Sequence, residues 1–177
     1  MESQRIDKNY KDLKEIERLY NDSFPKNERI DFGRLIRMIG DDRAMFAYLE
    51  DGKIIGMAYF FIFGDIAYLG YICVEEELRN RGYGTAILDK IKEEYRGYRI
   101  GIDIEEVKEN SDNFEERQRR KDFYSRNGFV SAGIFYNFFF VDYEILSCGG
   151  PINKTEWQQL VEKHWGNVAK TARYRRG

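Results

Sequence analysis

The stretch LRNRGYGTAILDKI, residues Leu78–Ile91, decides the fold class because it follows a strand-like segment and an amphipathic helix begins within it. The residues before it, AYLGYICVEEE, are rich in branched and aromatic side chains, which favour strands. The helical pattern places Ile87, Leu88 and Ile91 on one face, and the following YRIGIDIEEV alternates like a strand. Strand, helix and strand in this order predict two parallel neighbouring strands joined by a crossover.

The segments upstream of this crossover predict an antiparallel sheet with helices before it. Three strand-like segments, AMFAYLE, KIIGMAYFFIF and IAYLGYICV, are separated by the hairpin dipeptides Asp51-Gly52 and Gly64-Asp65. Helices are predicted from about Tyr10 to Phe24 and over FGRLIRMIG, from the spacing of their apolar residues. The sheet is therefore predicted to be mixed and mostly antiparallel.

The segments downstream predict a helix, a strand and a last helix. NFEERQRRKDFYSRN is expected to be helical up to Gly128, and IFYNFFFVDYEIL to form one long strand. NKTEWQQLVEKHWGNVAK follows as a helix with Thr155 as its cap. The 177 residues fit one α/β domain, with a core over about residues 2–146 and a C-terminal helical extension over about 153–171.

Composition limits the partners of the chain. Lys and Arg total 29 against 31 Asp and Glu, a net charge of -2, so no global positive field would attract nucleic acid or an anionic membrane. No signal-like N-terminus or long uncharged apolar run is present, which predicts a cytoplasmic protein. The two cysteines, Cys73 and Cys148, match no metal-ligand spacing, and with a single histidine no metal cofactor is expected.

The glycine-arginine turn, Arg79-x-x-Gly82-x-Gly84, suits an anion. Free N–H groups at a helix start carry partial positive charge, and glycines let an anion approach the backbone. Arg79 and Arg81 add charge that fits phosphate oxygens. The spacing matches neither the P-loop nor the dinucleotide fingerprint. The alternative is a plain helix start whose arginines are only solvated.

At these residues the sequence resembles the GCN5-related N-acetyltransferase (GNAT) superfamily, whose signature is [Q/R]-x-x-G-x-[G/A]. The family's second run, F-Y-x-x-x-G-F, is present as FYSRNGF, from Phe123 to Phe129. The resemblance covers roughly Glu2 to Leu146. It implies a mixed, mostly antiparallel central sheet flanked by helices, with splayed parallel fourth and fifth strands.

The resemblance also implies acetyl-CoA as co-substrate. In the family this turn binds the pyrophosphate, and the fourth strand pairs with the pantetheine arm. Arg120, on the arginine-rich helix, would meet the 3′-phosphate or the adenine, although a solvated helix face is an equal alternative. The implied cofactor-binding residues are Ile72, Cys73, Val74, Arg79, Asn80, Arg81, Gly82, Tyr83, Gly84, Thr85 and Arg120.

The implied reaction is acetyl transfer to a primary amine by direct attack in a ternary complex. Tyr124 stands at the family's usual position for the acid that protonates the departing thiolate. Its alternative role is to pack against the cofactor. Glu105 or Glu106, at the end of a strand, would serve as the base, and a solvated strand end is the alternative for both.

The acceptor pocket is expected in two places. By resemblance, the loop SFPKNERID covers it, with Glu28 and Asp31 attracting a cation and Phe24 forming an apolar wall. Tyr136 of the late strand would line it too, and the alternatives are an exposed loop and a core tyrosine. The acceptor would be a small-molecule or peptide amine. The late strand and last helix would suit a homodimer contact, and the second functional hypothesis is a non-catalytic acyl-CoA sensor or scaffold.

Overall fold

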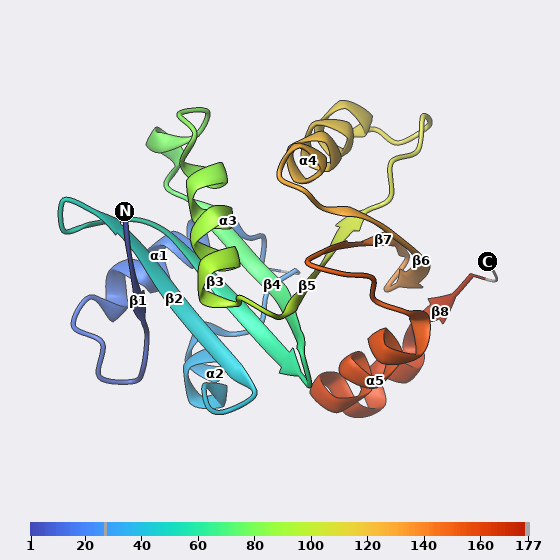
Figure 1. Cartoon of the computed structure of the whole chain (residues 1–177), viewed down its shortest axis with the longest axis horizontal. Coiled ribbons are helices and arrows are strands. Elements are labelled where there is room, and N and C mark those ends of the chain that lie inside the picture. The colour runs from blue at the N-terminus through green and yellow to red at the C-terminus, as the bar shows by residue number, and fades with distance from the viewer. Residues whose placement is uncertain (27, 176–177) are drawn as a thin grey trace. The chain divides into compact units, whose positions relative to one another are not determined.

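The computed structural model describes residues 1–26 and 28–175 (Figure 1). Among them, an eight-stranded sheet has the order β1-β2-β3-β4-β5-β7-β6-β8. The strands are β1 Glu2–Arg5, β2 Arg43–Glu50, β3 Lys53–Phe63, β4 Ile66–Val74, β5 Arg99–Glu105, β6 Val130–Phe138, β7 Val141–Cys148 and β8 Arg173–Tyr174. The helices are α1 Leu13–Ser23, α2 Phe32–Met38, α3 Tyr83–Glu94, α4 Phe114–Arg126 and α5 Lys154–Trp165, with 3-10 turns η1 Glu76–Leu78 and η2 Gly166–Thr171.

The chain forms two compact units that share β4. Unit 1 comprises Met1–Ile62 and Leu69–Arg96, and unit 2 comprises Phe63–Tyr68 and Gly97–Gly177. The mixed, mostly antiparallel sheet expected from the sequence is confirmed, and so is the C-terminal helix. Within residues 1–26 and 28–175, none of the helices is both long and apolar enough to cross a membrane.

In unit 1, helices cover both faces of the antiparallel strands β1, β2 and β3 (Figure 1). The Tyr48 hydroxyl donates to the Glu94 carboxylate of α3 at 3.2 Å. The Tyr59 hydroxyl donates to the Leu35 carbonyl of α2 at 3.3 Å. Tyr48 lies opposite Gly56, and Gly56 and Tyr59 are three residues apart on β3, so the two tyrosines point to opposite faces. Helix α3 therefore packs on one face and α2 on the other.

The hairpin between β2 and β3 forms at the predicted dipeptide. Asp51 and Gly52 have φ of 50° and 76°, as the tight turn of a two-residue hairpin requires. The next hairpin turns at Gly64, which has φ of 57°. Both turn predictions are confirmed.

In unit 2, the first residues of β4 pair with β5 in parallel, through Ile66↔Arg99, Ala67↔Ile100 and Tyr68↔Gly101. This pairing confirms the predicted crossover; the splay of the two strands stays a prediction. Strand β5 pairs antiparallel with β7, which places Glu144 beside Ile104 on one face.

Helices α4 and α5 cover opposite faces of β5. Lys121 of α4 contacts Glu144 at 2.6 Å, so α4 lies on the face of β5 that carries Ile104. A Cβ on Gly101 would meet Ile152 and Trp157, which places α5 on the other face. The two sides of β5 therefore have different chemical surroundings.

One arginine connects the ends of three elements of unit 2. The Arg99 guanidinium donates to both carboxylate oxygens of Asp65, at 2.9 and 2.6 Å. It also donates to both oxygens of Glu156, each at 2.9 Å, and to the Pro151 carbonyl at 2.8 Å. Two-pronged guanidinium contacts hold both distance and direction. The start of α5 is thereby attached to the turn before β4 and to the first residue of β5.

The cap of α5 differs from the expectation. Asn153, not Thr155, is the N-cap, and it forms a capping box with Glu156. Asn153 accepts from the Glu156 amide at 3.0 Å, and the Glu156 side chain accepts from the Asn153 amide at 3.0 Å. The helix begins one residue after the asparagine because this reciprocal pair satisfies two free amides.

The prediction of one long strand over IFYNFFFVDYEIL was wrong. The segment forms two strands, β6 and β7, joined by a two-residue turn at Phe139 and Phe140. Their φ values are 45° and 68°, and their exposed fractions are 63% and 97%. Asparagine and glycine normally occupy such a turn, whereas phenylalanine favours strands, so no local signal marked it. The short edge strands β1 and β8 were not predicted either.

Replacing Phe139-Phe140 with Asn-Gly should stabilise the protein. Left-handed backbone costs roughly 1–2 kcal/mol per ordinary residue, and Asn and Gly carry much less of that cost. We expect the free energy of unfolding to rise by about 1–2 kcal/mol, measured by urea denaturation. The control is Phe139→Ala with Phe140→Ala, which removes the exposed rings but keeps the unfavourable backbone. Equal stability of the two double variants would contradict the prediction.

Candidate active site

The glycine-arginine turn in unit 1 forms an open helix N-terminus. Gly82 is the N-cap of α3 with φ of 87°, and its carbonyl accepts the Ala86 amide at 3.1 Å. Asn80, two residues earlier, also has a left-handed backbone, with φ of 61°. The first amides of α3 belong to Tyr83, Gly84 and Thr85, and a helix offers them no internal acceptor.

The surroundings of this turn suit a bound anion. A Cβ on Gly82 would meet nothing within 4 Å, so the space beside this residue is open. Glycine is favoured here because the backbone has a positive φ, not because space is short. Arg79 and Arg81 are exposed. The Arg79 Nε donates to the Val74 carbonyl at 3.3 Å, which brings this guanidinium to the end of β4. The predicted phosphate-binding features are therefore together in unit 1.

The side chain of the first residue of α3 fixes the start of this helix to β2. The Tyr83 hydroxyl donates to Glu50 of β2 at 2.5 Å. The contact attaches the first residue of the helix to the β2–β3 hairpin. A helix terminus that binds an anion by its amides needs such a fixed orientation.

The predicted pantetheine strand ends in a buried thiol. Cys73 is buried, and burial raises its pKa to about 11. The thiol is therefore protonated at neutral pH and behaves as a small apolar side chain. Ile72 and Val74 on either side of it are half-buried.

The predicted acceptor loop is held in place by a tyrosine that the sequence did not reveal. The Phe24 ring lies 5.0 Å from the Tyr71 ring of β4. The Tyr71 hydroxyl accepts from the Ile30 amide at 3.1 Å and contacts the Glu28 carbonyl at 3.4 Å. Asp31 accepts from the amide of Arg34 and caps α2. Phe24 and Glu28 are thus brought to β4, and Asp31 has a local structural partner; their acceptor roles stay predictions.

Tyr124, the predicted acid, is buried on α4 in unit 2. Its ring lies 5.5 Å from that of Phe129. Burial raises the pKa of Tyr124, Arg120 opposes that effect, and Asp103 adds to it. A phenol in this setting keeps its proton at neutral pH, which a proton donor requires.

Both predicted bases form ion pairs. Glu105 contacts Arg117 at 3.0 Å and Arg120 at 3.6 Å. Glu106 contacts Arg175 at 2.7 Å and Lys108 at 3.5 Å. Protonating either carboxylate would break these pairs, which disfavours a base role. Arg120, predicted to contact the cofactor, also pairs with Glu116 at 2.9 Å.

Tyr136 is buried and hydrogen-bonded to an aspartate. Its hydroxyl donates to Asp103 Oδ2 at 2.8 Å, and the Tyr68 hydroxyl donates to Asp103 Oδ1 at 2.7 Å. Burial raises the pKa of Asp103, and the two phenols lower it in part. We had not predicted Asp103 as a site residue. Its signal in the sequence is an acid at an alternating position inside an apolar strand.

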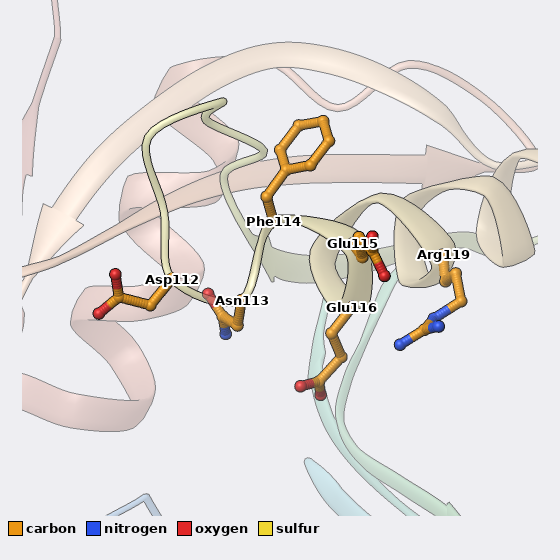
Figure 2. Close-up of a pocket in the computed structure, with 6 residues that line it drawn as sticks. All are labelled: Asp112, Asn113, Phe114, Glu115, Glu116 and Arg119. Carbon is orange, nitrogen blue, oxygen red and sulfur yellow. The ribbon is translucent and has the colours of Figure 1, made fainter.

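A pocket of about 350 Å³ lies at the start of α4 in unit 2 (Figure 2). Glu116 and Arg119 project from one side of the helix, and Phe114 points away from them. Its lining carries three carboxylates and one guanidinium, an excess of negative charge that disfavours phosphate. Its lining residues are Asp112, Asn113, Phe114, Glu115, Glu116 and Arg119. Across the described part of the chain, no group of three or more metal-ligating side chains could hold an ion.

A family model for the acetyltransferase (GNAT) domain matches residues 41–131, which contain the glycine-arginine turn, β5 and Tyr124. The chain belongs to the GNAT acetyltransferase family. No curated protein sequence matches this acetyltransferase significantly.

Solved structures share the fold of this GNAT acetyltransferase. A GNAT-family protein from Bacteroides thetaiotaomicron superimposes with a TM-score of 0.77 at 21% identity, over 96% of this chain and 98% of that one. An aminoglycoside 6′-N-acetyltransferase complexed with coenzyme A gives 0.66 at 15% identity, over 83% and 96%. A variant of the spermidine N-acetyltransferase from Vibrio cholerae gives 0.62 at 15%, over 84% and 94%. At these identities the likeness shows the fold alone.

Removing the Asp103 charge should stabilise this acetyltransferase in a pH-dependent way. A raised folded pKa means that the folded state binds the proton more tightly, so stability falls as pH rises from the unfolded value of about 3.9 through the folded pKa. We expect Asp103→Asn to raise the thermal midpoint at pH 8 and to change it little near pH 4. Glu162→Gln, an exposed site on α5, is the control. A lower midpoint for Asp103→Asn at both pH values would contradict the prediction.

Proposed function

We propose that this acetyltransferase moves an acetyl group from acetyl-CoA to a primary amine by direct attack in a ternary complex. The observation that carries the proposal is the open N-terminus of α3, where Gly82 exposes three amides beside Arg79 and Arg81. Amides and guanidinium groups together favour a pyrophosphate. Family membership supports the same donor.

In this proposal, two segments of unit 1 hold the donor. The amides from Arg81 to Thr85 and the side chain of Arg79 bind the pyrophosphate. The backbone from Ile72 to Val74 pairs with the pantetheine arm. Acetyl-CoA supplies an activated thioester, so the protein needs no covalent intermediate of its own.

In this proposal, side chains of the protein donate a proton to the departing thiolate and accept a proton from the attacking amine. Tyr124, which burial keeps protonated, donates to the departing thiolate. The attacking amine must be neutral, and Glu105 or Glu106 would accept its proton directly or through water. Their ion pairs with Arg117 and Arg175 make Tyr124 the better supported of these assignments.

The acceptor is proposed to be a small-molecule or peptide amine. Two of the similar structures are named for aminoglycosides and spermidine, which both carry several amines. The loop that carries Glu28 is held at β4 by Tyr71, and the Glu28 carboxylate is proposed to attract such a substrate.

Acetyl-CoA should selectively stabilise the protein against heat. At a ligand concentration about a hundredfold above Kd, linkage predicts about 2.7 kcal/mol and a midpoint shift of roughly 5 to 10 °C. Arg79→Ala should reduce the shift because a phosphate contact is lost. Arg96→Ala, an exposed arginine after α3, should keep it. An equal shift from ATP and NAD, or none from acetyl-CoA, would refute the donor assignment.

Tyr124→Phe should lower kcat by about a hundredfold and leave the acetyl-CoA midpoint shift nearly unchanged, since general acids contribute on that scale. Thiol release under saturating acetyl-CoA and amine measures kcat. Tyr98→Phe, at an exposed position, is the control. Unchanged kcat in Tyr124→Phe would show that another group protonates the thiolate. Acetyl-CoA binding without turnover in the wild type, across an amine panel, would favour the sensor or scaffold hypothesis.

A further inference from the structure

Within residues 1–26 and 28–175, the hydrogen-bond partners of the Asp103 carboxylate are both neutral. Each of its oxygens accepts from one phenol, Tyr68 or Tyr136. Among the residues that the structure describes, no lysine or arginine lies within ion-pair distance of it. A carboxylate in such surroundings keeps its negative charge only at a cost, because neither phenol supplies a compensating positive charge.

Aromatic rings surround this carboxylate. Tyr136 stacks between Tyr143 and Tyr174, with ring centroids 5.4 Å from each. Tyr68 contacts Trp157 at 5.0 Å and Trp165 at 5.7 Å. Aromatic faces attract ammonium and repel anions. Asp103 itself is half-buried as a residue, and both of its carboxylate oxygens accept hydrogen bonds from phenols.

A second polar group beside Asp103 lacks a partner. The Tyr174 hydroxyl is buried and has no hydrogen-bond partner within residues 1–26 and 28–175. Tyr174 pairs with Tyr136 across β6 and β8 and stacks on its ring, and Tyr136 donates to Asp103, which brings the Tyr174 side chain close to the carboxylate. Buried hydroxyls are normally hydrogen-bonded, so this one indicates a ligand that pairs with it.

The carboxylate and the predicted acid lie on opposite sides of β5 within unit 2. Tyr124 belongs to α4, which covers the face of Ile104, whereas Asp103 shares its face with Gly101 and Trp157.

We propose that Asp103 binds an ammonium group of a cationic acceptor, with the Tyr174 hydroxyl as a second hydrogen-bond acceptor. This assignment deepens the proposed function and rests on it for the identity of the ligand as the acetyl acceptor. An ammonium group has three donors and one positive charge, which matches a carboxylate that lacks a cation and a phenol that lacks a partner. The acceptor class is therefore an amine that is cationic at neutral pH, and carboxylates and phosphates are excluded by like charge.

The test is isothermal titration of spermidine and of kanamycin into four full-length proteins at pH 7. These are the wild type, Asp103→Asn, Tyr174→Phe and the control Glu162→Gln, which removes the same charge from an exposed position of α5. 1,4-Butanediol, which has no ammonium group, is the ligand control. The thermal midpoint of each protein, with and without acetyl-CoA, is measured in parallel.

We expect at least one amine to bind the wild type and Glu162→Gln equally. Asp103→Asn should weaken that binding about ten- to a hundredfold, and Tyr174→Phe about threefold to tenfold, as expected for charged and neutral hydrogen bonds. The thermal midpoints of both variants should be no lower than that of the wild type, which separates a loss of binding from a loss of folding. Wild-type affinity in Asp103→Asn, or no binding of either amine to the wild type, would overturn the proposal.

The acetyl-CoA midpoints separate this inference from the proposed function. If acetyl-CoA stabilises every protein while amine binding is insensitive to Asp103, the ammonium site is wrong and the donor assignment stands. If amines bind through Asp103 but acetyl-CoA stabilises none of the proteins, the proposed reaction fails and the ammonium site stands.

Discussion

The absence of a side chain at Gly56 is the constraint on which unit 1 depends. A Cβ at this position of β3 would lie 2.5 Å from Ile87 Cδ1 of α3 and 2.6 Å from the Cys73 carbonyl of β4. Movement of a side chain could not relieve the second contact, because the Cys73 carbonyl belongs to the backbone of β4. Helix α3 therefore lies directly on the sheet, and its N-terminus, with Gly82, is placed beside the end of β4 that Arg79 contacts. The position of the glycine-arginine turn depends on this close approach.

The two units carry local charge of opposite sign. Unit 1 presents helix amides and the exposed Arg79 and Arg81, which favour the negative charge of a pyrophosphate. Unit 2 presents Asp103 among phenols, which favours a positive charge. The net charge of -2 does not reveal this difference between the units. A small charged ligand responds to the local electrostatic field of its site and not to the total charge of the protein.

Sequence reasoning went furthest where the signal was local. The hairpin at Asp51-Gly52 and the helix start at Gly82 follow from glycine's backbone freedom, and both are present. It failed at the turn of Phe139-Phe140, where strand-forming residues occupy a left-handed backbone because the pairing of β6 with β7 outweighs local preference. It could not choose between Glu105 and Glu106, since their partners Arg117 and Arg175 are distant in sequence.

The sequence by itself determined the main order of elements, the mixed sheet and the helix start at Gly82, because periodicity and glycine placement act over a few neighbouring residues. Only the tertiary structure decided which carboxylate is paired and which is not. Asp103 meets Tyr68 from β4 and Tyr136 from β6, whereas Glu105 meets Arg117 from α4. These contacts join strands and helices 12 to 35 residues apart, and the charge state and binding role of a carboxylate depend on such partners.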